Sequence, residues 1–141
     1  MIDEKSVTSG RDSYSICIVL RHPERNAGSI SLALSLTPDA KLTKAKGNWL
    51  YASLQTGDDS SDYGAALAKV SQFLNANANY WPDFMRSGGE AEIVLNHTIA
   101  LTEESGDKCL ELQLAHSFLQ QLSAIGFALR VQGWQGQKEG F

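Results

Sequence analysis

Residues 90–101 alternate between apolar and polar side chains over a longer stretch than any other in this chain. One parity carries the side chains Ala91, Ile93, Leu95, His97 and Ile99. The other parity is mostly polar and includes Glu92, Asn96 and Thr98. A period of two predicts a β-strand with one buried face and one face in solvent, the usual arrangement in antiparallel sheets. The rest of the chain must therefore supply partner strands and a layer that covers the apolar face.

Four further strands are predicted. Residues 13–20 alternate, and the inward parity carries Tyr14, Ile16, Ile18 and Leu20. Trp49 to Leu54 forms a second strand, which ends at the turn residues of "QTGDDSSD". Lys108 to Leu114 returns from residues 90–101 as the second strand of a hairpin. Phe127 to Gln132 forms the last strand, with Phe127, Leu129 and Val131 inward.

The helical patterns lie between these strands. Residues 27–35 form a short helix with Ile30, Leu32 and Leu34 inward, and Thr37-Pro38 ends it because the residue before proline avoids helical geometry. Residues 62–75 show the clearest amphipathic period, with Asp58, Asp59 and Asp62 at the positive end of the helix dipole. Pro82 starts a short turn that Gly88 or Gly89 ends. A helix over 115–125 ends at Gly126.

The predicted order is β-α-β-α-β-β-α-β, which defines a single α+β domain. The domain spans residues 13–134, between a flexible arm at 1–12 and a tail at 135–141. We expect a largely antiparallel sheet with helices on one face. Its other face is then polar and carries Glu92, Asn96, Thr98, Glu111, Gln113, Arg130 and Gln132.

Composition and charge exclude several classes of protein. The chain is 43% hydrophobic and 20% charged, as globular domains are, and its net charge of −4 argues against nucleic-acid binding. No apolar run reaches the roughly 20 residues that cross a bilayer, so no membrane association is expected. The polar start predicts no signal peptide and a cytoplasmic location, where Cys17 and Cys109 are free thiols.

Sites for catalysis or a metal have weak support. No G-x-S-x-G, Walker loop, G-x-G-x-x-G or H-E-x-x-H motif is present. The set His97, Cys109 and His116 matches no zinc spacing and lacks a fourth ligand. We therefore predict no metal and no cofactor. An enzyme or small-ligand site would have to combine His97 or His116 with Glu92 or Glu111.

Two regions could bind a partner. On the polar sheet face, Glu92, Glu111 and Arg130 lie on strands expected to be neighbours. In "YWPDF", Tyr80 and Trp81 form either a partner-binding patch or a satellite of the core, and the high average burial of large aromatics favours the core.

The stretch "LSLTPDAKLTKAKGNW" at 34–49 combines a proline turn, three lysines and a tryptophan. Lys41, Lys44 and Lys46 are expected to lie in solvent without partners. Gly47 allows a sharp entry into the next strand. The parity of that strand is ambiguous, so the face that Trp49 covers stays open. Its size favours a role as a plug at the end of the sheet, over the helix before Pro38.

The pattern from Tyr14 to Val131 resembles the bacterial domain-of-unknown-function family 4279. The similarity rests on "LSLTPD" at 34–39, where the family shows "LGLxPT", on Lys46-Gly47 before Trp49, and on "LQQLSAIGFAL" at 119–129. Ser35 stands where the family has glycine. The resemblance implies a bacterial α+β protein and assigns no functional residues. Genes of such small domains often lie near toxin or secretion loci, which suggests an immunity-type or accessory role.

The sequence therefore favours a non-enzymatic module that binds another protein, whose oligomeric state is open. The alternative is the small enzyme or ligand-binding domain described above.

Overall fold

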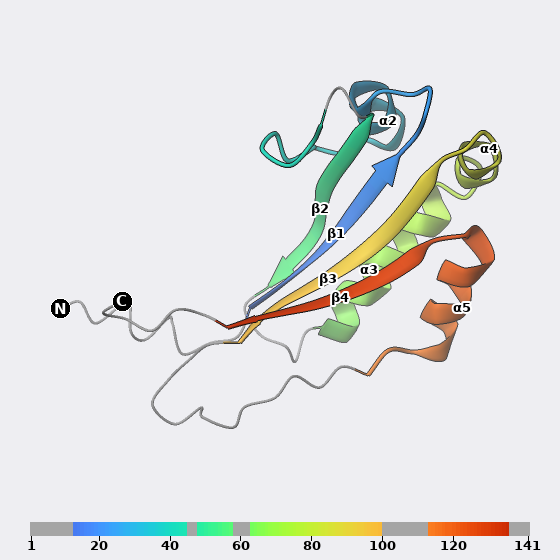
Figure 1. Ribbon diagram of the computed structural model, residues 1–141. Helices are drawn as coiled ribbons and strands as arrows, with labels where there is room; N and C mark the ends of the chain where they lie inside the picture. Colours follow the sequence, from blue (N-terminus) through green and yellow to red (C-terminus); the bar gives the residue numbers. More distant parts are fainter. Residues whose placement is uncertain (1–12, 45–47, 58–62, 100–112, 136–141) are drawn as a thin grey trace.

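A computed structural model of the chain describes residues 13–44, 48–57, 63–99 and 113–135 (Figure 1). The sheet has four strands in the order β2-β1-β3-β4. They are β1 (Ser13–Arg21), β2 (Trp49–Gly57), β3 (Glu90–Ile99) and β4 (Ala128–Gln135). The helices are α2 (Ala27–Leu34), α3 (Tyr63–Ala76), α4 (Trp81–Arg86) and α5 (His116–Ile125). The predicted class, an α+β domain with a largely antiparallel sheet, is confirmed, and the described elements follow the predicted order.

The central strand pairs set the register of the sheet. β1 pairs antiparallel with β2 and with β3, whereas β3 and β4 run parallel. The β1–β2 ladder shifts register between Ile16 and Cys17, so β2 carries one extra residue there. Because the predicted inward residues of β1 and β3 lie opposite one another, they form one continuous apolar surface.

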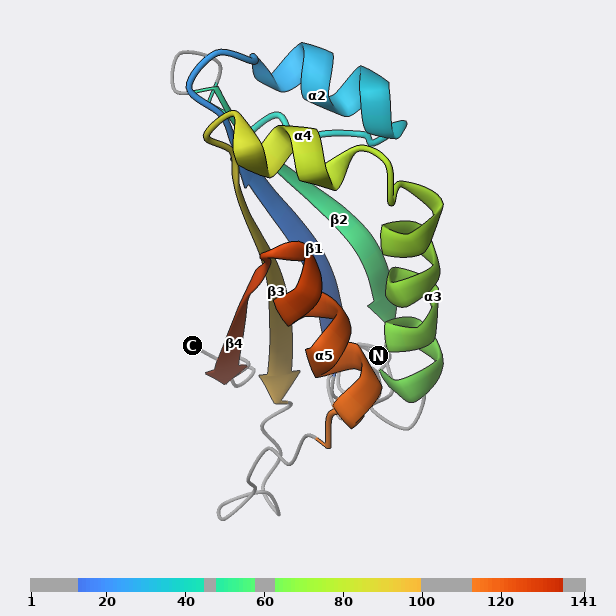
Figure 2. The same ribbon diagram turned by 90° about the vertical axis from the view of Figure 1, so that its right-hand side faces the viewer.

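One face of the sheet carries the core and the helices, which Figure 2 shows in front of the strands. α3 packs over β1 and β2, α5 lies over β4, and α2 and α4 lie together at the end where β1 finishes. Trp81 and Phe84 from α4 are the largest fully buried side chains. The Trp81 ring meets Phe127 edge-on at 4.9 Å and donates its indole N–H to the Leu74 carbonyl at 3.0 Å.

Two details of α2 differ from the prediction. The helix ends at Ser35, which adopts a left-handed conformation with φ 56°, so the prediction that Thr37-Pro38 ends it was wrong. The amides of Ser35 and Leu36 return to the last-turn carbonyls. Leu32 was expected inward, yet it is 83% exposed, because only Ala27, Ile30 and Leu34 fall on the side that meets the sheet. Gly126, at φ 86°, ends α5 as predicted.

The two edges of the sheet differ. Residues 38–44 run along the outer edge of β2, where the amide of Asp39 bonds to the Tyr51 carbonyl at 2.7 Å and Lys44 exchanges two backbone hydrogen bonds with Trp49. Along the outer edge of β4, no described strand follows. Val131 has the predicted inward parity, opposite Leu95, but is 45% exposed because β4 is an edge strand.

The predicted hairpin strand at 108–114 lies outside the described residues, except for Gln113 and Leu114, which are not in a strand. β3 has β1 on one side and β4 on the other along residues 92–98, so a hairpin partner cannot pair with it there. The arm at 1–12, the acidic helix entry at 58–62, Gly47 and the tail beyond Gln135 also lie outside the described residues.

Candidate protein interface

The face of the sheet opposite the helices, here called the open face, is covered by no described helix (Figure 1). Alternation explains it: every second residue of β1, β3 and β4 points away from the core. The residues of this parity include Ser15, Cys17, Val19, Arg21, Glu90, Glu92, Val94, Asn96, Ala128, Arg130 and Gln132. The open face therefore mixes polar side chains with a few apolar ones.

A groove of about 550 Å³ crosses the open face near the end of β1. Its walls come from all four strands and from two turns. The lining residues are Val19, Arg21, Trp49, Gly89, Glu90, Ala91, Glu92, Gly126, Ala128 and Arg130. Gly89, where β3 begins, and Gly126, where α5 ends, contribute only backbone to this lining. The groove thus combines one aromatic ring, a small apolar floor and four charged groups.

Two ion pairs cross the groove between neighbouring strands. Arg130 Nη2 lies 3.2 Å from Glu92 Oε1, and its Nε donates to Glu92 Oε2 at 3.2 Å. Arg21 pairs with Glu90, its register partner on β3, and its Nε and Nη2 both contact Glu90 Oε1. The arginine side chains in both pairs are more than half exposed, so each pair adds little to the free energy of unfolding. The predicted neighbours Glu92 and Arg130 are therefore brought together, whereas Glu111 lies outside the described residues.

Trp49 lies on the open face, which settles the parity that its sequence leaves ambiguous. Leu50 and Ala52 are fully buried on the core side, and Trp49 is half-buried opposite Arg21. The interpretation of Trp49 as a plug over α2 was wrong, because the side chain points to the other face. Lys44 is exposed, as expected, and its Nζ lies 4.8 Å from the centroid of the indole ring.

A polar cluster borders the groove further along the open face. Asn96 Nδ2 donates to Tyr51 Oη at 3.3 Å and lies 3.8 Å from Cys17 Sγ. Partial burial, with further contributions from the neighbouring Cys17, raises the pKa of Tyr51 to about 12. The Cys17 thiol is 3% exposed and is free, so it behaves as a packed residue.

The histidine and carboxylate residues of the alternative enzyme site do not meet. His97 lies on the core side of β3 and is 1% exposed, whereas Glu92 lies on the open face of the same strand. His116 is exposed at the start of α5. Cys109 is outside the described residues, and among those described no three His, Cys, Asp or Glu side chains are grouped to hold a metal ion.

The aromatic candidates Tyr80 and Trp81 differ in their burial. Trp81 is 1% exposed, so it belongs to the core and offers no surface to a partner. Tyr80 is half-buried and stacks on Phe84, with the Arg25 guanidinium 5.6 Å from its ring centroid. It stands directly before α4 and is not among the residues that line the groove.

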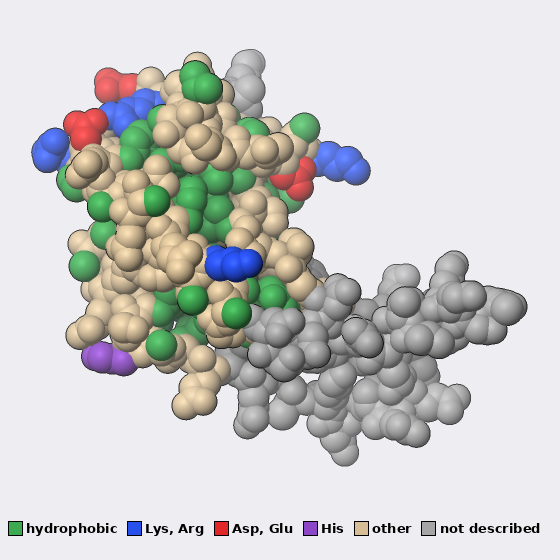
Figure 3. All heavy atoms as spheres, turned by 180° about the vertical axis from the view of Figure 1, so that it is seen from behind, with side chains coloured by type: hydrophobic (Ala, Val, Ile, Leu, Met, Phe, Trp, Pro, Cys, Tyr) green, Lys and Arg blue, Asp and Glu red, His purple; other side chains and the backbone are tan. Residues whose placement is uncertain are grey.

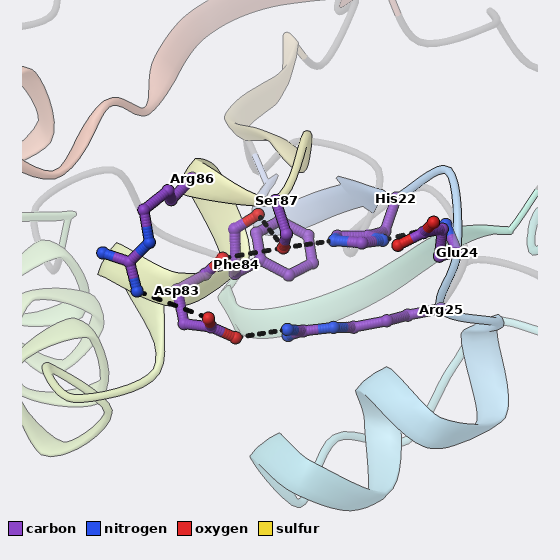
Figure 4. A network of polar contacts seen from close by, with 7 residues as sticks. All are labelled: His22, Glu24, Arg25, Asp83, Phe84, Arg86 and Ser87. Carbon is purple, nitrogen blue, oxygen red and sulfur yellow. Dashed lines mark hydrogen bonds and ion pairs between the residues drawn. The ribbon is translucent and has the colours of Figure 1, made fainter.

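A second polar group, here called the α4 clasp, consists of His22, Arg25, Asp83 and Ser87 (Figure 4). The amide of Glu24 donates to His22 Nδ1 at 3.0 Å, so the ring proton is on Nε2, which donates to Ser87 Oγ at 2.8 Å. The Ser87 hydroxyl donates in turn to the Asp83 carbonyl at 2.7 Å.

The direction of these hydrogen bonds argues against a nucleophilic site. A serine activated by histidine donates its proton to the ring, whereas here the ring donates to the serine. Arg25 pairs with Asp83, and this hydrogen bond holds the pKa of the Asp83 carboxyl below its usual range. The clasp thus fastens the chain after β1 to α4 at two points, Asp83 in its first turn and Ser87 at its C-terminal cap.

The described charged side chains on the helical side of the molecule are mixed in sign. Figure 3 shows that acidic and basic groups lie near one another at the end with α2 and α4, and that most of the coloured surface in this view is neutral. On the face shown in Figure 3, the described basic side chains do not gather into one patch.

Comparisons with protein-family models, with curated proteins and with solved structures found no match for this chain. None of the described helices is long and apolar enough to cross a membrane.

Sequence reasoning missed Arg21, Glu90 and Trp49 as members of the groove. Arg21 and Glu90 each have the polar parity of their strand, so the sequence alone could have placed both on the open face. Their meeting depends on the β1–β3 register, which links residues 69 positions apart. His22 gave no signal, because its burial results from the packing of α4.

Proposed function

We propose that this protein is a non-enzymatic module that binds another protein through its open face. The observation that carries the proposal is the groove, in which Trp49 and two arginines border a small apolar floor. Tryptophan and arginine are the residue types that most often dominate the energy of protein interfaces. A bacterial immunity or accessory role and a cytoplasmic location, which the sequence suggests, are kept as part of this proposal.

The ion pairs support a protein partner over a simple charged ligand. Glu90 and Glu92 already neutralise Arg21 and Arg130, so the groove presents planar, exposed guanidinium groups without a strong net charge. Such groups can form additional hydrogen bonds with backbone carbonyls of a partner. The steering role that the sequence predicts for Glu111 concerns a residue outside the described part of the chain.

A photo-cross-linking amino acid placed at Ser53 tests the proposal. Ser53 is exposed on β2 and is the register partner of Cys17, so its side chain projects from the open face. Gln72, exposed on α3, gives a matched control on the helical side. In cells of the source organism, we expect a defined cross-linked protein from position 53 and not from position 72, identified by mass spectrometry.

The affinity of that protein then tests the groove itself. We expect Trp49→Ala and Arg130→Ala each to weaken binding by about tenfold or more, and Lys69→Ala on α3 to leave it unchanged. Equal cross-linking from both faces, or an affinity that ignores both groove substitutions, contradicts the proposal.

A further inference from the structure

We infer that the outer edge of β4 pairs with the same edge of a second copy of this chain, which gives a twofold-symmetric dimer with a continuous eight-stranded sheet. An unpaired edge presents a row of backbone N–H and C=O groups, and proteins normally protect such edges with prolines, lysines, bulges or covering segments. β2 has this protection: Pro38 bridges to Ala52, and Thr43 Oγ1 bonds both the amide and the carbonyl of Tyr51.

β4 has none of these devices among the described residues. It contains no proline or lysine, and its ladder with β3 is continuous from Ala128 to Gln135 without a bulge. Its single charge, Arg130, is held over the open face by Glu92 and does not point along the edge. Among the described residues, the edge is therefore long and regular, and nothing there blocks the approach of another strand.

Exposed apolar side chains border this edge on the core side. Val131 is 45% exposed on β4, and Leu119 is 40% exposed on α5. Gln121 contacts α3 through Ser71 and Asn75, and Leu119 is two residues away, about 200° around the helix. Leu119 thus projects away from α3, toward the β4 side of the molecule. Pairing at the edge would bury both side chains.

The sequence of β4 is complementary to itself in one antiparallel register. With Val131 opposite the partner's Val131, Arg130 lies opposite the partner's Gln132 and Leu129 opposite the partner's Gly133. The apolar side chains then meet on the core side, and no like charges face one another. A register centred on Arg130 would instead oppose two guanidinium groups, which is destabilising. A twofold axis perpendicular to the sheet generates this register, so the interface is isologous and both helical layers lie on the same side of the sheet.

The test measures the mass of the full-length chain in solution by light scattering or sedimentation over a dilution series. We expect a dimer for the wild type. Val131→Lys and Val131→Glu each place like charges at the twofold axis and should raise the dissociation constant by about 10- to 100-fold. An equimolar mixture of the two variants should recover dimers, because the charges are then opposite. A folding defect could not be rescued in this way.

Leu32→Lys is the matched control, since Leu32 is more exposed than Val131 and lies on α2, away from the edge. It should leave the dissociation constant unchanged, and circular dichroism should show that all variants fold. A wild type that stays monomeric overturns the inference, whether the β4 amides exchange rapidly with solvent or are protected by another segment of the chain. Equal weakening by Leu32→Lys, or a mixture that does not recover dimers, overturns it as well.

Discussion

Single residues in this chain adopt conformations that their type disfavours. Ser35 takes a left-handed conformation at the end of α2, with φ 56° and ψ 44°. In this region the Cβ of an L-residue crowds the following carbonyl, at a cost of roughly 1–2 kcal/mol that glycine avoids. The strain of this conformation would fall on any residue with a Cβ at position 35, whatever its side-chain chemistry.

Replacing Ser35 with glycine should therefore stabilise the protein. The relief of strain is partly offset by the greater freedom of glycine in the unfolded chain, so we expect a net gain of about 0.5–1 kcal/mol in the free energy of unfolding. Urea denaturation measures it. Ser35→Ala is the control, because it removes the hydroxyl and keeps the Cβ, and it should give no gain. A glycine variant less stable than wild type would show that Ser35 is not strained.

At the scale of elements, alternation and helical periodicity located the strands and helices because each is a local property of the chain. The predictions that the structure contradicts concern features that depend on contacts distant in sequence. Leu32 has an apolar side chain, but the side of α2 that is buried depends on how the helix lies against the sheet. A hairpin after β3 was expected, yet both sides of β3 are taken by strands distant in sequence. For the same reason, the sequence predicted the Glu92–Arg130 side of the groove and not the side formed by Arg21 and Glu90.

The α4 clasp gives a prediction for one element. Ser87→Ala removes the acceptor of His22 Nε2, whose ring is 1% exposed and cannot turn to solvent. Leaving a buried donor unsatisfied should lower the free energy of unfolding by about 1–3 kcal/mol. In hydrogen-exchange measurements, the backbone amides of α4 should exchange faster in this variant than in the wild type, before the rest of the protein is affected.

Ser117→Ala serves as the comparison for that variant, since Ser117 is exposed on α5. It should change the free energy of unfolding by no more than about 0.5 kcal/mol. If both serine variants have the same stability, the hydrogen bond between His22 and Ser87 does not fasten α4.

At the scale of the whole molecule, we expect alkaline pH to lower the free energy of unfolding. Burial raises the pKa of Tyr63 from 10.0 to about 12, and its hydroxyl has no hydrogen-bond partner among the described residues. The folded state therefore keeps a proton that the unfolded state releases. Stability from this group is complete below pH 10 and is lost as the pH rises toward 12.

Tyr63→Phe should reduce the decline in stability over this pH window and change little at neutral pH, because a phenyl ring keeps the packing on Tyr14. Denaturant unfolding at a series of pH values measures both effects. Tyr51→Phe is expected to act in the same window, since the pKa of Tyr51 is also raised to about 12. An unchanged pH dependence in the Tyr63 variant would assign the alkaline unfolding to other groups.

The strand order has a consequence for how the chain is made. β1 is the first of the four described strands to be synthesised, and in the sheet it lies between β2 and β3. The β1–β2 pair can form early, but the second edge of β1 stays unpaired until Glu90–Ile99 has left the ribosome. β4 must wait longer, because a parallel partner of β3 requires the crossover through α5. Assembly of this sheet thus depends on contacts distant in sequence, which favours slower folding than a chain of the same length with mostly local contacts.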